Sequence, residues 1–292
     1  MHFINSNPLK AWVFSLLTLA SSASLAQPVE RIISLAPSLT ELVFSAGAGD
    51  KLVGVVSFSD YPPEALNRAH VGSYNALNLE RIIELNPDLI LAWASGNKPQ
   101  DIARLQNMGF RVLVRDTQQL DDIPNLIEEI GRLTDQTDTA RTEAERLRQQ
   151  LHFLRAQYQD KSLVKVFYQV WNQPLITVNG EQFIGQAMAL CGGVNVFADQ
   201  TALAPHVSRE AVINANPDLI LLGGTGEVQQ AWLRSWQALS FLTAQQNGQI
   251  IALNADQYQR PTARLIEGLA DLCQLIDQAR NQARPTRQIQ TD

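Results

Sequence analysis

The chain has 292 residues, of which 45% are hydrophobic and 18% are charged. This is ordinary globular composition, and it excludes a disordered or collagen-like protein. The formal net charge is −6, from 23 Lys and Arg against 29 Asp and Glu, and the basic residues are scattered along the chain. That distribution argues against nucleic acid as a partner. The two cysteines, Cys191 and Cys273, are too few for a disulfide scaffold and too far apart for a CxxC pair.

Residues 1–26 have the composition of a secretory signal peptide. They contain no acidic residue and one cation, Lys10, which precedes the apolar run 11–20 and a small-residue segment ending in Ala26. A membrane anchor would need about 20 apolar residues. We therefore expect cleavage after Ala26 and export to a compartment that permits disulfides. There, a Cys191–Cys273 bridge is expected, with two buried free thiols as the alternative.

From residue 31 onward, short β-branched runs alternate with helical periodicity. The first half predicts strands at 31–35, 51–56, 88–93 and 111–114, and helices at 38–46, 79–85, 98–108 and 121–133. The second half predicts strands at 164–170, 219–222 and 249–253, and helices at 182–190, 209–215 and 262–280. Strands separated by single helices predict an α/β fold with mostly parallel sheets flanked by helices. We expect Ser38 and Glu41 to form a capping box, and Asn78 to cap the next helix.

An internal repeat indicates that this architecture occurs twice. Residues 80–91 and 210–221 align without a gap, and both contain the motif NPDLIL. In each half, an Asn-Pro pair is expected to end a helix, and the Leu-Ile-Leu run that follows enters a core. The repeat also places two acidic residues, Glu80 and Glu210, at equivalent positions.

A long amphipathic helix is predicted between the halves, over residues 134–160. Its apolar positions recur at intervals of three and four residues: Ala140, Ala144, Leu147, Leu151, Leu154 and Tyr158. We therefore expect an N-terminal lobe at 27–133, a C-terminal lobe at 161–283 and a ligand cleft between them. A helix without Gly or Ser predicts a stiff connection with little domain closure. Residues 284–292 lack periodicity and are expected to be a disordered tail.

No familiar catalytic motif is present in the sequence. GxSxG, HExxH, GxxxxGK[ST] and a complete GxGxxG are all missing, and the four histidines share no metal-ligand spacing. We therefore expect no catalytic residue, no metal site and no enzyme, with an exported α/β enzyme as the alternative. His206, in a loop that precedes a helix, is the histidine considered for contact with a ligand.

Aromatic side chains gather instead at predicted strand ends and in loops. They are Phe58, Tyr61, Tyr74, Trp93, Trp171 and Tyr258. Ligands of parallel α/β sheets bind beyond the carboxyl ends of the strands. These positions therefore indicate a broad, partly apolar ligand surface in the cleft.

Several motifs together resemble a known family. They are residues 57–63 (SFSDYPP), 78–82 (NLERI), 87–93 (PDLILAW), 191–193 (CGG), 207–210 (VSRE) and the pair Asp256 and Arg260. The chain is similar over residues 31–280 to periplasmic substrate-binding proteins of the helical-backbone type, which serve ABC importers of cobalamin, siderophores and haem. The motif VSRE, the Ala-Trp strand end, the two cysteines and the Asp-x-x-x-Arg pair resemble the cobalamin branch.

The resemblance implies a transported ligand, cobalamin, in place of a resident cofactor. It implies that Phe58, Tyr74 and Trp93 form one cleft wall. It implies that the other wall is supplied by consecutive residues: Asp256, Gln257, Tyr258, Gln259 and Arg260. The chain departs from the family at three positions. Phe58 stands where the family often has Tyr, Ala204 stands where a Trp is expected, and Gln257 replaces another aromatic residue. Trp171 is the aromatic that could compensate.

The resemblance also implies partners and a location. The family docks through one exposed glutamate per lobe, which assigns Glu80 and Glu210 to an inner-membrane ABC permease dimer with its ATPase subunits. The expected location is the periplasm, and the free protein is expected to be a monomer. A ferric-siderophore or haem receptor of the same fold is the alternative. Siderophore sites favour several converging arginines, whereas only Arg260 is marked here.

Overall fold

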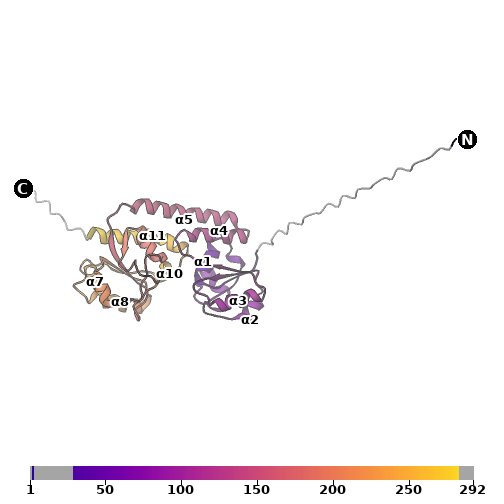
Figure 1. The fold of residues 1–292 in the computed structure, drawn as a ribbon, viewed down its shortest axis with the longest axis horizontal. Coiled ribbons are helices and arrows are strands. Elements are labelled where there is room, and N and C mark those ends of the chain that lie inside the picture. The colour runs from indigo at the N-terminus through magenta and orange to yellow at the C-terminus, as the bar shows by residue number, and fades with distance from the viewer. Residues whose placement is uncertain (1, 3–28, 283–292) are drawn as a thin grey trace, which may run out of the picture.

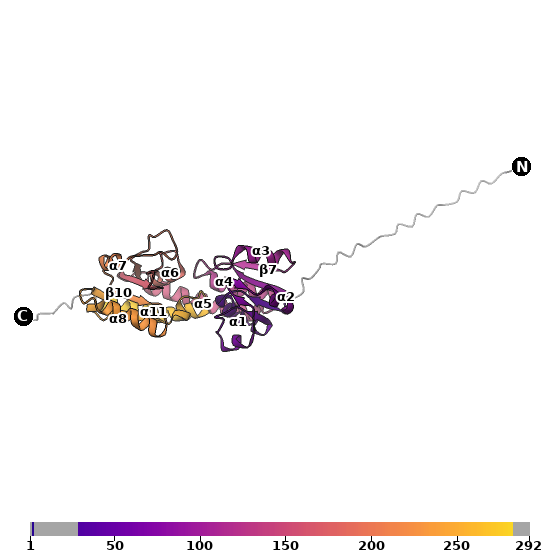
Figure 2. The same ribbon diagram turned by 90° about the horizontal axis from the view of Figure 1, so that it is seen from below.

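The computed structural model describes His2 and residues 29–282. The predicted signal peptide and the predicted tail at 284–292 lie outside these residues. Two α/β lobes lie side by side, and a layer of helices runs along one edge of both (Figures 1 and 2). This layer consists of α4 (Asp122–Leu133), α5 (Thr137–Tyr158) and α11 (Ala263–Gln282). The predicted fold class is confirmed.

The N-terminal lobe is built on a five-stranded, all-parallel sheet of order β3-β2-β1-β6-β7. Its strands are β1 (Ile32–Ser34), β2 (Leu52–Val55), β3 (Ala69–His70), β6 (Leu89–Trp93) and β7 (Val112–Arg115). Its helices are α1 (Pro37–Ser45), α2 (Leu79–Leu85) and α3 (Pro99–Asn107), with 3-10 turns at Gly49–Lys51 and Pro63–Asn67. A small antiparallel pair, β4 (Gly72–Ser73) and β5 (Ala76–Leu77), carries Tyr74 in its turn.

The C-terminal lobe has a four-stranded parallel sheet of order β11-β10-β8-β9. Its strands are β8 (Val164–Gln169), β9 (Gly193–Asn195), β10 (Leu219–Leu222) and β11 (Ile250–Ala252). Its helices are α6 (Phe183–Leu190), α7 (Arg209–Ala215), α8 (Gly226–Gln237), α9 (Thr243–Gln246) and α10 (Ala255–Tyr258). The sequence patterns do not include β9, α8, α9 or α10. Helix α8 is mostly polar, and it is held to the lobe by the buried Trp232 and Trp236, one helical turn apart.

The repeat predicted from the sequence has the same geometry in both lobes. Asn78 caps α2 by accepting a hydrogen bond from the Arg81 N–H, and Ser208 caps α7 in the same way. Both helices end at an asparagine in the left-handed conformation, Asn86 with φ 41° and Asn216 with φ 42°. The predicted Asn78 cap and both helix ends are therefore confirmed.

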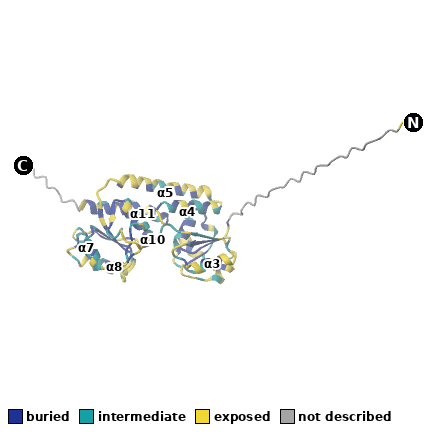
Figure 3. Cartoon of the chain, in the orientation of Figure 1, coloured by how far each residue is buried: buried dark blue, intermediate teal, exposed yellow. Residues whose placement is uncertain are grey.

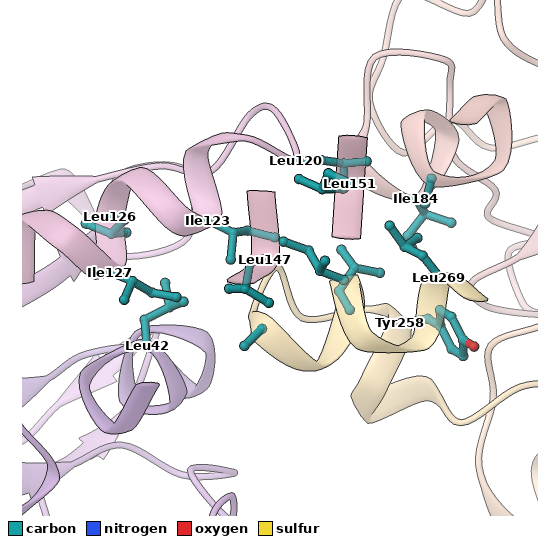
Figure 4. Close-up of a cluster of buried hydrophobic side chains, with 14 of the residues drawn as sticks. Leu42, Leu120, Ile123, Leu126, Ile127, Leu147, Leu151, Ile184, Tyr258 and Leu269 are labelled. Carbon is teal, nitrogen blue, oxygen red and sulfur yellow. The ribbon is translucent and has the colours of Figure 1, made fainter. Parts of the chain in front are cut away.

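The long helix α5 packs both lobes onto one hydrophobic core. Its buried residues are the six that the periodicity predicts. Figure 3 shows its outer face exposed. The core cluster beneath it is continuous from one lobe to the other. Figure 4 shows part of it, where Leu42 of α1, Ile127 of α4, Leu147 of α5 and Leu269 of α11 each lie on a different helix. Because cores are close-packed, a shared core resists rotation of one lobe against the other.

Cys191, at the end of α6, and Cys273, on α11, form a disulfide with their Cα atoms 4.7 Å apart. The predicted bridge is confirmed and the alternative of two free thiols is wrong. The bond joins residues separated by 82 positions within the C-terminal lobe. In the chain-entropy model, a loop of this length stabilises the folded state by roughly 4 kcal/mol. Among the helices of residues 29–282, none has the length and apolar character needed to span a bilayer.

Candidate functional site: a cavity between the lobes

A cavity of about 800 Å³ lies between the two lobes. The N-terminal lobe contributes residues just past β1, β6 and β7, the loop after β2, and Tyr74. The C-terminal lobe contributes the segments 181–183, 201–204 and 259–261. On the N-terminal side this is the region beyond the carboxyl ends of parallel strands, where α/β folds bind ligands. Of the residues predicted to bind ligand, five line the cavity: Phe58, Tyr74, Trp93, Gln259 and Arg260.

The aromatic wall belongs to the N-terminal lobe, and its two central rings are held in fixed positions. The Tyr74 and Trp93 rings lie 6.0 Å apart, tilted at 55°. The indole Nε1–H of Trp93 donates to Asp116 Oδ1 at 3.1 Å, and the Ser95 hydroxyl donates to the same oxygen. Asp116 itself lines the cavity. The indole therefore presents a face of defined orientation to a ligand.

Asn97 joins the segments that carry these two rings. Its side chain is buried, 3% exposed. The amide oxygen accepts from the Trp93 backbone N–H at 2.7 Å, and the amide nitrogen donates to the carbonyls of Leu35 and Tyr74. One buried side chain thus ties the end of β1, the Tyr74 turn and the end of β6 together.

Phe58 is presented differently from the other two aromatics. Its backbone has a φ of 66°, which an aromatic residue rarely adopts, and its side chain is 74% exposed. The neighbouring Ser59 is buried and accepts a hydrogen bond from the Thr40 hydroxyl at 3.1 Å. Because Ser59 is anchored, the Phe58 backbone is held in this strained conformation and its ring lies at the cavity rather than in the core. Strain of this kind is typical of functional sites.

Arg260, which lines the cavity, belongs to an ion-pair network that joins the lobes. Arg260 donates to Glu41 at 3.0 Å, to Asp60 at 2.7 Å and to Asp256 at 2.9 Å. Arg264 donates two hydrogen bonds to the same Glu41, at 2.9 and 2.5 Å. We call these five residues the interlobe clasp. Glu41 and Asp60 belong to the N-terminal lobe, and the others to the C-terminal lobe.

The predicted capping box of Ser38 and Glu41 is wrong. Helix α1 begins at Pro37 with Ala36 as its N-cap, and no side chain caps it. Proline suits the first helical position because it has no N–H to satisfy. Ser38 therefore lies inside the first turn, where it lines the cavity. Glu41 is buried, 3% exposed, and its carboxylate meets arginines of the other lobe.

The contacts within the clasp also shift the pKa values of Asp60 and Arg260. Burial alone would raise the pKa of Asp60, but the hydrogen bond and positive charge of Arg260 outweigh it and lower that pKa below its ordinary value. Burial alone would lower the pKa of Arg260, but the hydrogen bonds that Arg260 donates to Asp60 and Glu41 outweigh it and raise that pKa. Arg264 additionally lies over the Tyr61 ring, 3.9 Å from the centroid.

Four residues predicted to bind ligand do not line the cavity. Asp256 is half-exposed and holds Arg260. Tyr258 is buried and donates its hydroxyl to the Gly268 carbonyl at 2.9 Å; burial raises its pKa to about 12. Gln257 faces α11 and donates to the Arg264 carbonyl. Trp171 packs edge-on against Trp232. Along α10 and the two residues that follow it, successive side chains point to different sides, so the segment 256–260 cannot bring all five of its side chains to the cleft.

Other lining residues were not among the predicted ligand contacts. They include Asp116, Gln118, Glu181, Gln182, Phe183 and Leu203. Asp116 follows β7 directly, so its position past a strand end was the available signal. The others come from loops and, in the case of Phe183, from the first residue of α6, and their position depends on how the lobes meet. Gln186 of α6 donates to the Gln118 carbonyl at 2.6 Å and so brings two of these segments together across the lobes.

Ala204 lines the cavity, but His206 does not: it lies in the loop before α7 and is exposed. Within residues 29–282, no three His, Cys, Asp or Glu side chains come together as metal ligands would.

Glu80 and Glu210 are exposed and lie away from the cavity lining, each in the first turn of its helix. Neither carboxylate forms an ion pair with another residue of the described chain. The backbone N–H of Glu210, then the Ser208 hydroxyl and Arg209, lower the pKa of the Glu210 carboxyl. It is therefore ionised at neutral pH. The two lobes place these acids at equivalent, accessible positions.

Two parallel α/β lobes fixed under one helical layer, with a partly aromatic cavity between them, define a bilobal ligand-binding protein. The chain belongs to the periplasmic binding protein family, whose model matches residues 32–257. A vitamin B12-binding protein of Vibrio cholerae serotype O1 is 40% identical over 255 residues, which cover 87% of this chain and 92% of the relative. The vitamin B12-binding protein of Yersinia pestis is 38% identical over 262 residues, 90% of each chain.

Solved structures agree with this assignment. The crystal structure of the periplasmic vitamin B12-binding protein BtuF of Vibrio cholerae superposes with a TM-score of 0.79 at 39% identity, covering 86% of this chain and 98% of that one. The periplasmic haem-binding protein RhuT from Roseiflexus sp. RS-1 has a TM-score of 0.75 at 24% identity, covering 86% and 99%. The second similarity concerns the fold alone.

Proposed function

We propose that this protein is a non-enzymatic periplasmic receptor that captures cobalamin between its lobes and delivers it to an inner-membrane ABC permease. The observation that carries the proposal is the interlobe cavity, which has an aromatic wall and, among the described residues that line it, one arginine, which is already paired. Phe58, Tyr74, Trp93, Gln259 and Arg260 are the proposed ligand contacts. A vitamin B12-binding relative at 40% identity supports the same ligand.

The chemistry of the wall suits a corrinoid. Its macrocycle is wide, partly apolar and edged with amides. Aromatic faces such as Trp93 can bury the ring, and Gln259 and Arg260 can bond to the amides of the rim. Ala204 and Leu203, exposed on the opposite lobe, leave room for a ligand of this width.

The remaining predicted residues are given supporting roles. Asp256 orients Arg260 through their 2.9 Å hydrogen bond, and Tyr258 anchors α10 to α11 through Gly268. Gln257 adds a second bond between the same helices, to Arg264. We assign Trp171 to packing against Trp232 rather than to the ligand.

The arginine content of the cavity argues against haem or an acidic ferric siderophore. Haem carries two propionates, and an anionic ligand needs cationic partners that are free to pair with it. Arg260 is the one cation among the described residues that line the cavity. Its guanidinium already donates to Glu41, Asp60 and Asp256.

Calorimetry against cyanocobalamin, haem and a ferric siderophore, side by side, tests the proposal. We expect saturable one-to-one binding of cyanocobalamin, weakened about ten-fold or more by Trp93→Ala through loss of a buried aromatic face. The matched control is Phe153→Ala, which removes an exposed aromatic from α5, outside the cavity. Tighter binding of haem or the siderophore than of cyanocobalamin would reject the proposed ligand. Turnover of the ligand would reject the non-enzymatic role.

For delivery, we propose that Glu80 and Glu210 dock on the two halves of a permease dimer that carries its ATPase subunits. Their support is the shared geometry of the repeat, since α2 and α7 each have a side-chain N-cap, an asparagine at the end and an exposed acid in the first turn. A free monomer with two equivalent acids fits a two-fold partner. Arginines on the permease would be the complementary groups.

A further inference from the structure

We propose that the charge on the cavity wall selects ligands edged with intact amides against carboxylate-bearing analogues of the same shape, and that Asp116 and Glu181 are the specificity-determining residues. The inference rests on the proposed function and adds a rule of selection within the corrinoid class. It depends on three observations. Each lobe places one acidic residue on the cavity wall, neither carboxylate is paired with a cation within residues 29–282, and the arginine that lines the cavity is already paired with acids.

Asp116 supplies a negative charge on the N-terminal side. It lines the cavity directly after β7, and its Oδ1 accepts from the Trp93 indole and the Ser95 hydroxyl. Its Oδ2 accepts no hydrogen bond from any residue in 29–282. Both donors to Oδ1 are neutral, so no cation of the described chain pairs with this carboxylate beside the aromatic wall.

Glu181 supplies a negative charge on the C-terminal side. It precedes α6, lines the cavity and is exposed. Its backbone groups are bonded, N–H to Asn179 and carbonyl to Gln186. Its carboxylate makes neither a hydrogen bond nor an ion pair with the part of the chain that the structure describes. These bonds place the backbone of Glu181 at the cavity, and no cation of the described chain pairs with its carboxylate.

Arg260 does not offset these acids. The clasp surrounds it with Glu41, Asp60 and Asp256, and Glu41 is shared with Arg264. The five clasp residues carry three negative and two positive charges. The clasp and the wall together therefore leave the cavity net negative.

A ligand edge made of primary amides can donate N–H groups to both free carboxylates. Replacing one amide by a carboxylate removes those donors and places a like charge in a partly enclosed site. Repulsion between charges a few ångströms apart in such surroundings corresponds to roughly ten- to a hundred-fold in affinity. Neutral isosteres of Asp116 and Glu181 keep the shape of the cavity and a carbonyl oxygen that accepts from a ligand amide, and they remove this repulsion.

The test compares cyanocobalamin with each isomer in which a single peripheral amide has been hydrolysed to the acid. Binding is measured by calorimetry at neutral pH for the unaltered protein, Asp116→Asn, Glu181→Gln and the double variant. We expect at least one acid isomer to bind roughly ten-fold or more weakly than cyanocobalamin. We expect this ratio to fall toward one in the double variant. An Asn side chain can still accept from Trp93, so the wall keeps its orientation.

The matched controls are Asp160→Asn and Glu227→Gln, which remove exposed acids outside the cavity lining and should leave the ratio unchanged. If the unaltered protein binds every acid isomer as tightly as cyanocobalamin, the proposal is wrong. It is equally wrong if the ratio survives in the double variant while cyanocobalamin still binds. Failure to bind cyanocobalamin at all would reject the proposed function itself, and the selection rule with it.

Discussion

The carboxylate of Glu41, on the first helix of the N-terminal lobe, accepts two hydrogen bonds from the guanidinium of Arg264, on the last helix of the C-terminal lobe. The residues are 223 positions apart in the chain. Glu41 is 3% exposed and also accepts from Arg260. A buried, bidentate contact of this kind ties the lobes together at the side of the cavity.

Glu41→Gln should destabilise the protein by about 3 kcal/mol, because it leaves two largely buried arginines without their shared carboxylate. Urea unfolding monitored by circular dichroism measures the change. The control is Glu143→Gln, which removes an acid from the more exposed ion-pair network of Arg146 on α5 and should cost less than about 1 kcal/mol. Equal losses for the two variants would show that the clasp adds nothing beyond a surface pair.

The clasp should also weaken in acid. The pKa of Asp60 is lowered from 3.8 when the protein folds, so its contribution to stability is fully present above about pH 4 and disappears as the pH falls through the folded-state pKa. The side chain is 46% exposed, which limits this contribution to less than about 1 kcal/mol. Asp60→Asn should therefore flatten the fall of Tm below pH 4, whereas the exposed-site variant Asp199→Asn should follow the unaltered protein.

The sequence predicts local and repeated features of the fold well, because they depend on neighbours in the chain. The period of three and four residues identifies the whole buried face of α5, and the repeat identifies the paired ends of α2 and α7. The aromatic residues at strand ends that form one cavity wall follow from the general position of ligands in parallel sheets.

The clasp could not be predicted in the same way. Glu41 three residues after Ser38 matches a capping box, and only the meeting of the two lobes shows that its carboxylate serves Arg264 instead. Asn97 is similar, since two of its three hydrogen bonds reach the carbonyls of Leu35 and Tyr74, which are 62 and 23 positions away in the sequence. Such roles depend on tertiary contacts, which leave no local pattern.

The lobes should stay in place when ligand binds, because they share one hydrophobic core and the clasp. Small-angle X-ray scattering should give the same radius of gyration with and without cyanocobalamin. Glu41→Gln tests the contribution of the clasp. Because the shared core alone should hold the lobes, this variant should also have the same radius of gyration with and without cyanocobalamin. A clear contraction of the unaltered protein on binding would contradict the rigid arrangement.

Phe58 should lower the stability of the protein while it increases the affinity for the ligand. Phe58→Gly relieves an aromatic residue of a φ of 66° and removes a ring that is 74% exposed, so Tm should rise, by the equivalent of roughly 0.5–1 kcal/mol. Cyanocobalamin affinity should fall about ten-fold with the loss of the ring. Phe58→Ala provides the comparison: it loses the same ring but keeps a Cβ atom, so it should bind weakly without the gain in Tm. A drop in Tm for the glycine variant would show that the ring packs on the fold.

Capture and delivery should fail separately, because the cavity and the two exposed acids lie on different parts of the molecule. Arg260→Ala should weaken cyanocobalamin binding by roughly ten-fold or more through loss of a charged hydrogen bond. The double variant Glu80→Ala with Glu210→Ala should bind cyanocobalamin normally, yet bind the permease poorly and support little uptake in proteoliposomes, because arginines on the permease would lose their partners. Glu227→Ala is the matched control, an exposed acid in the first turn of α8, and it should dock and deliver normally. If the double variant instead loses ligand affinity while it docks normally, the equivalent glutamates are not the docking pair.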